Sequence, residues 1–268
     1  AGYRPKYTST VWSVIMLAQL GADPDHPNVR KACNYVLDHT RAKQGFFSVH
    51  ATQTGAVHCL QGNLVNSLID LGMFGDDRLQ FAINWMARSI TGAGFGKVDQ
   101  KEIDPHYIRS GISGPGFLCS ANDHQPCAWG AVKTALALSK IPKAMQTPEI
   151  MQAIDVCKKF LLSVNPSSAE YPHPYGKNPS GSWFKFGFPV FYVTDLLQNI
   201  SALLGLGLDG DARLKDAIDL IESKQDEAGR WKMEYSYNGK TWVEIEENKM
   251  PSKWVTYRAL SVLKRFYS

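Results

Sequence analysis

The 268-residue sequence lacks the patterns that mark membrane-spanning and nucleic-acid-binding proteins. No apolar run reaches the roughly 18 residues that a bilayer-crossing helix needs, so the sequence predicts no transmembrane segment. Lys and Arg side chains are spread along the chain, and the formal net charge is only +4. The chain therefore has no polybasic block of the kind that binds nucleic acid or anionic lipid, and we expect no nucleic-acid partner.

Several enzyme motifs are absent as well. The chain has no Gly-rich phosphate loop, no His-Glu-x-x-His motif and no Gly-x-Ser-x-Gly motif, which argues against nucleotide hydrolysis and serine-hydrolase chemistry. It begins Ala-Gly-Tyr, without Met and without a signal-peptide pattern. Its five cysteines are an odd number and do not form the pattern of a small disulfide-stapled domain. We therefore expect reduced thiols in a cytoplasmic protein.

Helical segments repeat along the chain in pairs. The first helix of each pair is apolar nearly all round, and a turn and a second, amphipathic helix follow it. In residues 213–223, for example, Leu214 and Ile218 oppose Asp216. Residues 252–267 form a last, unpaired helix, so the sequence predicts about four and a half helical hairpins. The apolar first helices are predicted at residues 8–21, 57–72, 126–138 and 189–207.

These two kinds of helix predict an all-α fold with two rings. An apolar helix must be buried on most sides, whereas an amphipathic helix needs cover on one face only. An inner ring of helices inside an outer ring, which is an α/α toroid, satisfies both; an open superhelical solenoid is the alternative. We expect residues 1–268 to form one such domain. Residues 232–248 alternate and contain Asn238-Gly239, which predicts a small β-hairpin flap.

The fourth pair ends Lys-Gln-Asp-Glu-Ala-Gly-Arg-Trp, which sets Gln225, Gly229 and Trp231 in a Gln-x-x-x-Gly-x-Trp arrangement. This arrangement resembles the QW repeat of squalene/hopene cyclases, a superfamily that includes the β subunits of protein prenyltransferases. The resemblance implies the α/α toroid fold but fixes the reaction poorly. Toroids of this superfamily usually have more hairpins. The comparison implies a missing N-terminal portion, a smaller or open barrel, or a barrel completed by a partner such as a second copy.

The acid motif of those cyclases, Asp-x-Asp-Asp, is absent. Asp209-Gly210-Asp211 comes closest, but it lies in the turn between two predicted helices, where Asp and Gly are common. The sequence therefore does not support squalene cyclisation.

A dense group of chemically active residues precedes the third apolar helix. Cys119, Asp123, His124 and Cys127 lie within nine residues. Cys59 occupies the matching position one pair earlier, so we expect Cys59 and Cys127 at the same rim of the barrel. Both begin inner helices, and the positive end of a helix lowers the pKa of a thiol.

Three interpretations of this group remain open. The first is a zinc site, with Asp123 as a supporting or direct ligand, similar in kind to the zinc site of prenyltransferase β subunits but with a different motif. The second is a set of free thiols that act with His124 and Asp123 as acids, bases or nucleophiles, as a resemblance to linalool dehydratase-isomerase implies. The third is a structural role, which we also predict for Cys33 and Cys157. The candidate zinc ligands are Cys59, Cys119, His124 and Cys127.

Aromatic and polar residues elsewhere are predicted to line a central cavity. The long segment 171–189 is rich in Gly, Pro and aromatic residues and is typical of a lid. Asp195 would be a buried carboxylate that needs a partner, for which Lys133 is the candidate. The predicted substrate-binding residues are Asn63, Trp129, Tyr175, Trp183, Phe186, Tyr192, Asp195 and Trp254.

Together these features predict an enzyme that acts on a small hydrophobic or isoprenoid-like ligand in a central cavity. A Cys/His centre at one rim, with or without zinc, would supply its chemistry. The alternative is a non-catalytic toroid that binds a ligand or protein and has structural cysteines.

Overall fold

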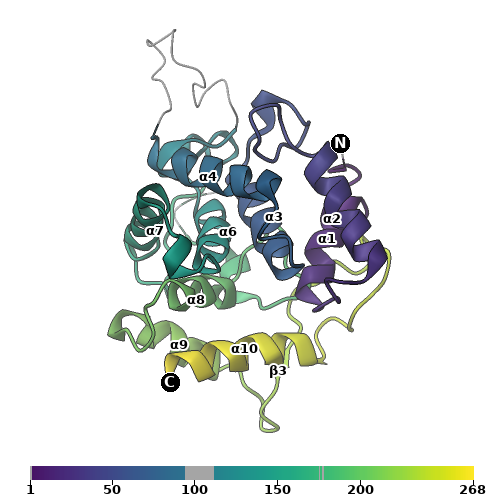
Figure 1. Ribbon diagram of the computed structural model, residues 1–268. Coiled ribbons are helices and arrows are strands. Elements are labelled where there is room, and N and C mark those ends of the chain that lie inside the picture. The colour runs from purple at the N-terminus through teal and green to yellow at the C-terminus, as the bar shows by residue number, and fades with distance from the viewer. Residues whose placement is uncertain (1, 94–111, 175, 177) are drawn as a thin grey trace.

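The computed structural model describes residues 2–93, 112–174, 176 and 178–268. In these residues, four pairs of helices and a last single helix follow one another, so the predicted four and a half hairpins are confirmed (Figure 1). None of the described helices is long and apolar enough to cross a membrane. The helices are α1 (Thr10–Gln19), α2 (Pro27–His39), α3 (His58–Asp70), α4 (Asp77–Thr91), α6 (Ala128–Ser139), α7 (Pro148–Leu161), α8 (Leu196–Gly205), α9 (Lys215–Glu222) and α10 (Lys253–Phe266).

The helices form an inner and an outer set, as an α/α toroid requires. Among the first helices of the pairs, α1 packs on α3, α3 on α6 and α6 on α8, and α8 packs on α10. The second helices lie outside them, and α4 packs on α7 (Figure 1). Burial follows the same division, because α3 and α6 are buried on nearly every side while α2 buries one stripe that includes Val29, Cys33 and Val36. The all-α toroid-like prediction is confirmed.

Glycines bring α3 and α6 unusually close together. A Cβ atom on Gly62 would lie 2.2 Å from the carbonyl carbon of Lys133. A Cβ atom on Gly130 would lie 3.1 Å from the Cβ of His58 and 3.9 Å from the Sγ of Cys59. At the contact of Gly62 with Lys133 there is room only for a residue without a side chain. The close contact sets the N-terminal ends of the two helices side by side.

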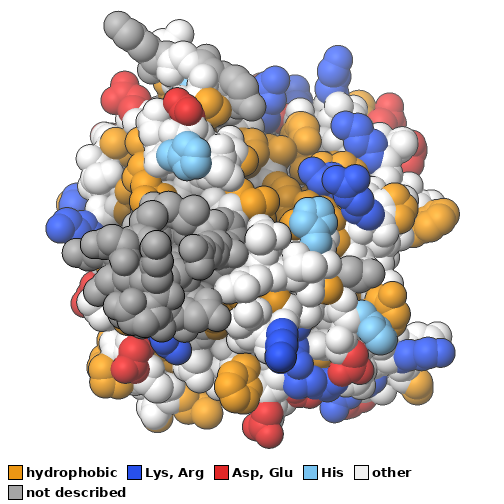
Figure 2. Space-filling view, turned by 90° about the horizontal axis from the view of Figure 1, so that it is seen from above, with side chains coloured by type: hydrophobic (Ala, Val, Ile, Leu, Met, Phe, Trp, Pro, Cys, Tyr) orange, Lys and Arg blue, Asp and Glu red, His pale blue; other side chains and the backbone are white. Residues whose placement is uncertain are grey.

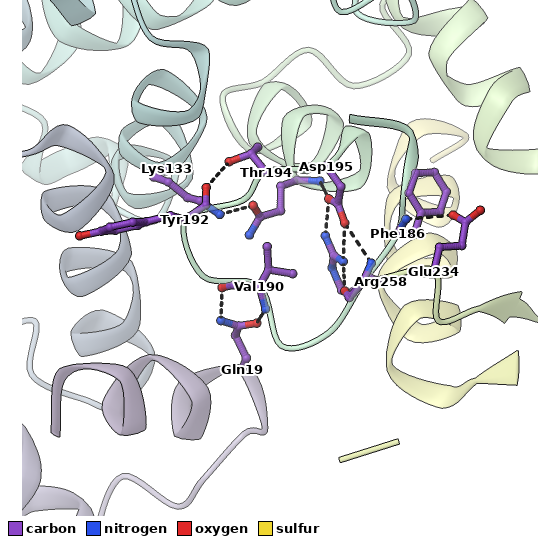
Figure 3. Close-up of polar contacts among 11 residues, drawn as sticks. Gln19, Lys133, Phe186, Val190, Tyr192, Thr194, Asp195, Glu234 and Arg258 are labelled. Carbon is purple, nitrogen blue, oxygen red and sulfur yellow. Dashed lines mark hydrogen bonds and ion pairs between the residues drawn. The ribbon is translucent and has the colours of Figure 1, made fainter. Parts of the chain in front are cut away.

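The fourth inner helix starts later than predicted. Residues 189–195 were expected to be helical, but α8 begins at Leu196 because Asp195 acts as its N-cap, accepting a hydrogen bond from the backbone N–H of Gln198 at 2.9 Å. The preceding residues run across from the end of α1 to the start of α8. The side-chain amide of Gln19 holds them there by two hydrogen bonds, 2.7 Å and 2.8 Å, to the backbone of Val190 (Figure 3). We call residues 188–194 the crossing segment.

The predicted β-hairpin at residues 232–248 is present only at its base. Strand β3 (Trp231–Lys232) pairs antiparallel with β4 (Pro251–Ser252), and the residues between them form an irregular loop rather than a continuous ladder. The side chain of Asn238 donates a hydrogen bond to the Glu246 carbonyl (2.9 Å), which folds the loop on itself in place of a tight turn. A second short pair, β1 (Leu118–Cys119) and β2 (Gln125–Pro126), precedes α6.

Candidate active site

Three cysteines from separate elements line one cavity of about 540 Å³, which we call the thiol cavity. Cys59 is the second residue of α3, and Cys127 is the N-cap of α6. Cys119 lies on β1, and the turn that follows returns the chain to Cys127, whose backbone N–H donates to the Phe117 carbonyl at 2.8 Å. All five cysteines of the chain are free thiols. The structure thus brings together the three thiols of the predicted site.

The thiols of Cys119, Cys127 and Cys59 influence one another in the cavity wall. The interaction with Cys119 lowers the pKa of Cys127, but the interaction with Cys59 and burial outweigh it and raise that pKa to about 12. The pKa of Cys119 is also raised, first by its hydrogen bond with Cys127 and then by burial. Cys119 and Cys127 are therefore held in their neutral form.

The expectation that helix N-termini lower the pKa values of these thiols is wrong for Cys119 and Cys127. Burial and thiol–thiol hydrogen bonding act in the opposite direction and prevail. The two cysteines predicted to be structural, Cys33 and Cys157, are fully buried in the hydrophobic core. Burial raises their pKa values to about 11 and about 12, respectively.

Aromatic residues form much of the wall of the thiol cavity. Among the predicted substrate-binding residues, Trp129, Trp183 and Tyr192 line it, the last from the crossing segment. The hydroxyl of Tyr192 is buried and makes no hydrogen bond of ordinary geometry with a described residue, although Tyr3 lies near enough to interact with it. Burial and then the neighbouring Tyr3 raise the pKa of Tyr192 well above its ordinary value. Tyr192 is thus a neutral donor at the cavity wall, with Tyr3 as its polar neighbour.

Basic side chains surround this apolar space. Arg4, Lys6, His50 and His173 line the thiol cavity, and no Asp or Glu of the described residues does. Viewed from above, hydrophobic side chains reach the surface beside a group of Lys, Arg and His side chains (Figure 2). The cavity therefore suits an apolar ligand that is neutral or carries negative charge at its exposed end.

Asp123 and His124 do not take part in the thiol cavity. Both side chains are exposed and both backbones are left-handed, with φ of 54° and 56°, because they form the tip of the turn between β1 and β2. The predicted set of three cysteines and one histidine is therefore not assembled. Within the described ranges, no three or more His, Cys, Asp and Glu side chains are placed to hold a metal ion. Zinc binding by the thiols stays a prediction.

Two predicted residues belong to a different cavity. Asn63 and Trp254 line a space of about 330 Å³ between α1, α3, α6, α8 and α10, which we call the lysine cavity because Lys133 also lines it. The crossing segment contributes to both cavities, since Val190 lines the lysine cavity and Tyr192 lines the thiol cavity. In Figure 3 Tyr192 points away from the polar groups around Lys133. The single central cavity that we expected is thus two cavities.

Phe186, Tyr175 and Asp195 are the predicted substrate-binding residues that remain. Phe186 is buried in the core and lines neither cavity, and Tyr175 lies outside the described residues. Asp195 pairs with Arg258 of α10 at 2.6 Å, so the prediction that Lys133 is its partner is wrong (Figure 3). Lys133 instead donates a hydrogen bond to the side-chain oxygen of Gln198. Sequence reasoning missed Arg258, although a charged residue on a predicted inner helix was a usable signal.

Comparisons with known proteins give distant structural similarity only. No protein-family model and no curated protein matches the chain. The chain is similar to the type II terpene cyclase MstE from Scytonema without ligand (TM-score 0.33, 16% identity, covering 98% of this chain and 90% of that chain). It is also similar to a variant of MstE in complex with its substrate, geranylgeranyl dihydroxybenzoate (TM-score 0.35, 15% identity, 98% and 89%). A variant in complex with the product merosterolic acid A gives a TM-score of 0.36 and 15% identity, covering 95% of this chain and 86% of that chain.

Proposed function

We propose that the thiol cavity is the active site of an enzyme that moves protons on a small, apolar, isoprenoid-like alcohol or alkene. The observation that carries this proposal is an aromatic cavity whose wall holds three thiols and the buried hydroxyl of Tyr192. Its volume of about 540 Å³ is typical of small-molecule sites.

Cys59 is the group we assign to proton abstraction. It is the second residue of α3, Cys127 is the N-cap of the neighbouring α6, and both line the cavity. Tyr192 is the group we assign to the substrate oxygen, because its buried hydroxyl is a neutral donor in the same wall.

Dehydration of an alcohol illustrates the proposed reaction class. The Cys59 thiolate takes a proton from the carbon next to the one that bears the hydroxyl, and the electrons of that C–H bond form the double bond. The C–O bond breaks, and the leaving oxygen takes a proton from Tyr192, so that water departs. The proton on Cys59 then returns to Tyr192 through solvent. The reverse sequence is hydration, and no oxidant or reductant is needed.

The test is turnover of prenol, geraniol and farnesol by the full chain in D₂O, with products and deuterium content measured by gas chromatography and mass spectrometry. We expect dehydration or isomerisation of at least one alcohol. The rate should fall by roughly a hundredfold or more in Cys59→Ala and in Tyr192→Phe, which is the usual contribution of acid–base groups. Cys33→Ala, which removes a thiol from the core, is the matched control. Absence of product from every alcohol, or equal turnover by Cys59→Ala and wild type, would overturn the assignment.

The second candidate is a toroid that binds such a ligand without converting it. The raised pKa values of Cys119 and Cys127 favour it, because neutral thiols are poor bases at pH 7. Trp129 and Trp183 line the cavity, so their fluorescence should report binding of geraniol. Saturable binding that persists in Cys59→Ala, with no product, would favour this candidate over the enzyme.

A further inference from the structure

The lysine cavity is lined by cations but, among the described residues, by no carboxylate. Lys133, Lys140 and Arg258 all contribute to its wall. Two of them have a counter-charge: Arg258 binds Asp195 through two nitrogens, and Lys140 pairs with Asp70. Lys133 has no ion pair with a described residue, although Asp195 acts on it from a greater distance. It is therefore the one of these three cations without an ion-pair partner.

Lys133 is deeply buried for a lysine, with 1% of its surface exposed. An ammonium group has three N–H donors. In the described part of the chain, Lys133 donates to the side-chain amide oxygen of Gln198. A buried charge without a partner is costly, so an anion that enters the cavity would relieve that cost. Lys133 is one of the residues that line the cavity.

A second polar group in the same wall also lacks a partner. The side-chain oxygen of Asn66 is buried and accepts no hydrogen bond from any described residue. Rotation of the amide would present its N–H₂ group to the cavity instead. The wall also has an aromatic part, where the rings of Phe188 and Trp254 are stacked at 4.8 Å and 5°. The cavity is thus lined both by polar groups and by a flat aromatic pair.

We propose that the lysine cavity binds a small monocarboxylate with an apolar or aromatic body. The carboxylate accepts hydrogen bonds from Lys133, with Asn66 as a second polar contact, and the body packs against Phe188 and Trp254. This site lies on the opposite side of the crossing segment from the thiol cavity and does not rest on the function proposed for that cavity.

Protonation of Lys133 gives the binding a characteristic pH dependence. Burial lowers the pKa of Lys133 to about 7; Asp195 and Cys59 act against this shift and Arg258 adds to it. The carboxylate binds the protonated lysine, so at higher pH binding must be accompanied by proton uptake. The affinity should therefore weaken about tenfold for each pH unit above 7.

Isothermal titration of the full chain with benzoate, at pH 6 and at pH 8.5, tests the proposal. Benzyl alcohol has the same aromatic ring as benzoate but no charge, and inorganic phosphate is charged but has no ring. We expect saturable one-site binding of benzoate at pH 6 that is at least about tenfold tighter than that of either comparison ligand. Lys133→Met should weaken it at least about tenfold, whereas the exposed Lys143→Met control should leave it unchanged.

The proposal is overturned by any of four results: no benzoate binding at pH 6, preference for phosphate, equal affinity in Lys133→Met, or affinity that does not fall with rising pH. If Lys133→Met does not fold, proton uptake by the wild-type protein decides, measured by titration in two buffers of different ionisation enthalpy. Benzoate binding is measured without any isoprenoid, so its outcome is separate from that of the turnover experiment.

Discussion

Asp195 and Arg258 form a two-point ion pair, with Nη2–Oδ1 and Nη1–Oδ2 distances of 2.6 Å and 2.8 Å. The pair joins the N-cap of α8 to α10, and the carboxylate side chain is only 4% exposed. Removal of the arginine leaves a buried charge without a partner, which usually costs about 3–5 kcal/mol. We therefore expect Arg258→Met to lower the free energy of unfolding in urea by about that amount.

Two further variants give this prediction its controls. The exposed pair of Lys215 and Asp219 is a surface contact four residues apart on α9, so Lys215→Met should cost no more than about 0.5 kcal/mol. The double variant Asp195→Asn with Arg258→Met removes the orphaned charge and should recover part of the lost stability. Equal costs for Arg258→Met and Lys215→Met would show that the pair is not a stabilising contact.

Cys119 and Cys127 should be slow to alkylate in the folded protein. Their pKa values are raised, to about 12 for Cys127, so at pH 8 almost none of either thiol is the reactive thiolate. We expect reaction with iodoacetamide, followed on the separate peptides by mass spectrometry, to be at least about a hundredfold slower than in urea-unfolded protein. The rate at Cys127 should still be rising at pH 10. A rate that levels off near pH 8 would show that the pKa of Cys127 is not raised in this way.

The hairpin repeat was predictable because the information for it is local. Three of the four apolar helices end at a Leu-Gly pair, namely Leu20-Gly21, Leu71-Gly72 and Leu206-Gly207. The turns contain their own caps, such as Asp76 and Asp211. The meeting of Cys59 with Cys127 followed from their equivalent places in neighbouring pairs. Neither inference needed knowledge of contacts between distant segments.

The predictions that were wrong depend on contacts between segments that are far apart in the sequence. The crossing segment is as apolar as the predicted inner helices, but it is a series of bends rather than a helix. Its hydrogen bonds to Gln19 and Asn63, which are far away in the sequence, could not be predicted. The partner of Asp195 comes from α10, which no spacing rule selects. His124 was placed with the thiols because it is near them in sequence. The turn from β1 to β2 instead leaves its side chain in solvent.

His58 should make the stability of the protein fall as the pH is lowered from about 6.5 to 4. Its Nε2 donates to Ser89, whose hydroxyl donates to the Met86 carbonyl, and its Nδ1 is buried without a partner in the described residues. Burial lowers the pKa of His58 to about 4, so between these pH values the unfolded chain binds more protons than the folded one. The shift from about 6.5 corresponds to a loss of about 3 kcal/mol.

Urea unfolding at pH 7 and at pH 4.5 measures this effect. In His58→Gln the part of the pH dependence that comes from this residue should disappear, so the two curves should differ by less than in the wild type. His39→Gln removes an exposed histidine and serves as the matched control. A wild-type pH dependence retained in His58→Gln would assign the acid sensitivity to other groups.

Gly62 should be intolerant of even a single methyl group. A Cβ atom there would lie 2.2 Å from the carbonyl carbon of Lys133. This carbon is part of the α6 backbone, so it cannot move aside as a flexible side chain could. Alanine favours a helix by up to about 1 kcal/mol over glycine, but forcing α3 and α6 apart costs more, typically about 1–3 kcal/mol for an overpacked core. We therefore expect Gly62→Ala to lower the free energy of unfolding, whereas Gly75→Ala, at an exposed turn with no atom within 4 Å, should change it by less than about 0.5 kcal/mol. The separation of the helices should also loosen the contact between Cys59 and Cys127, so alkylation of Cys127 should accelerate in Gly62→Ala. A Gly62→Ala protein as stable as the wild type would mean that α3 and α6 do not pack this closely.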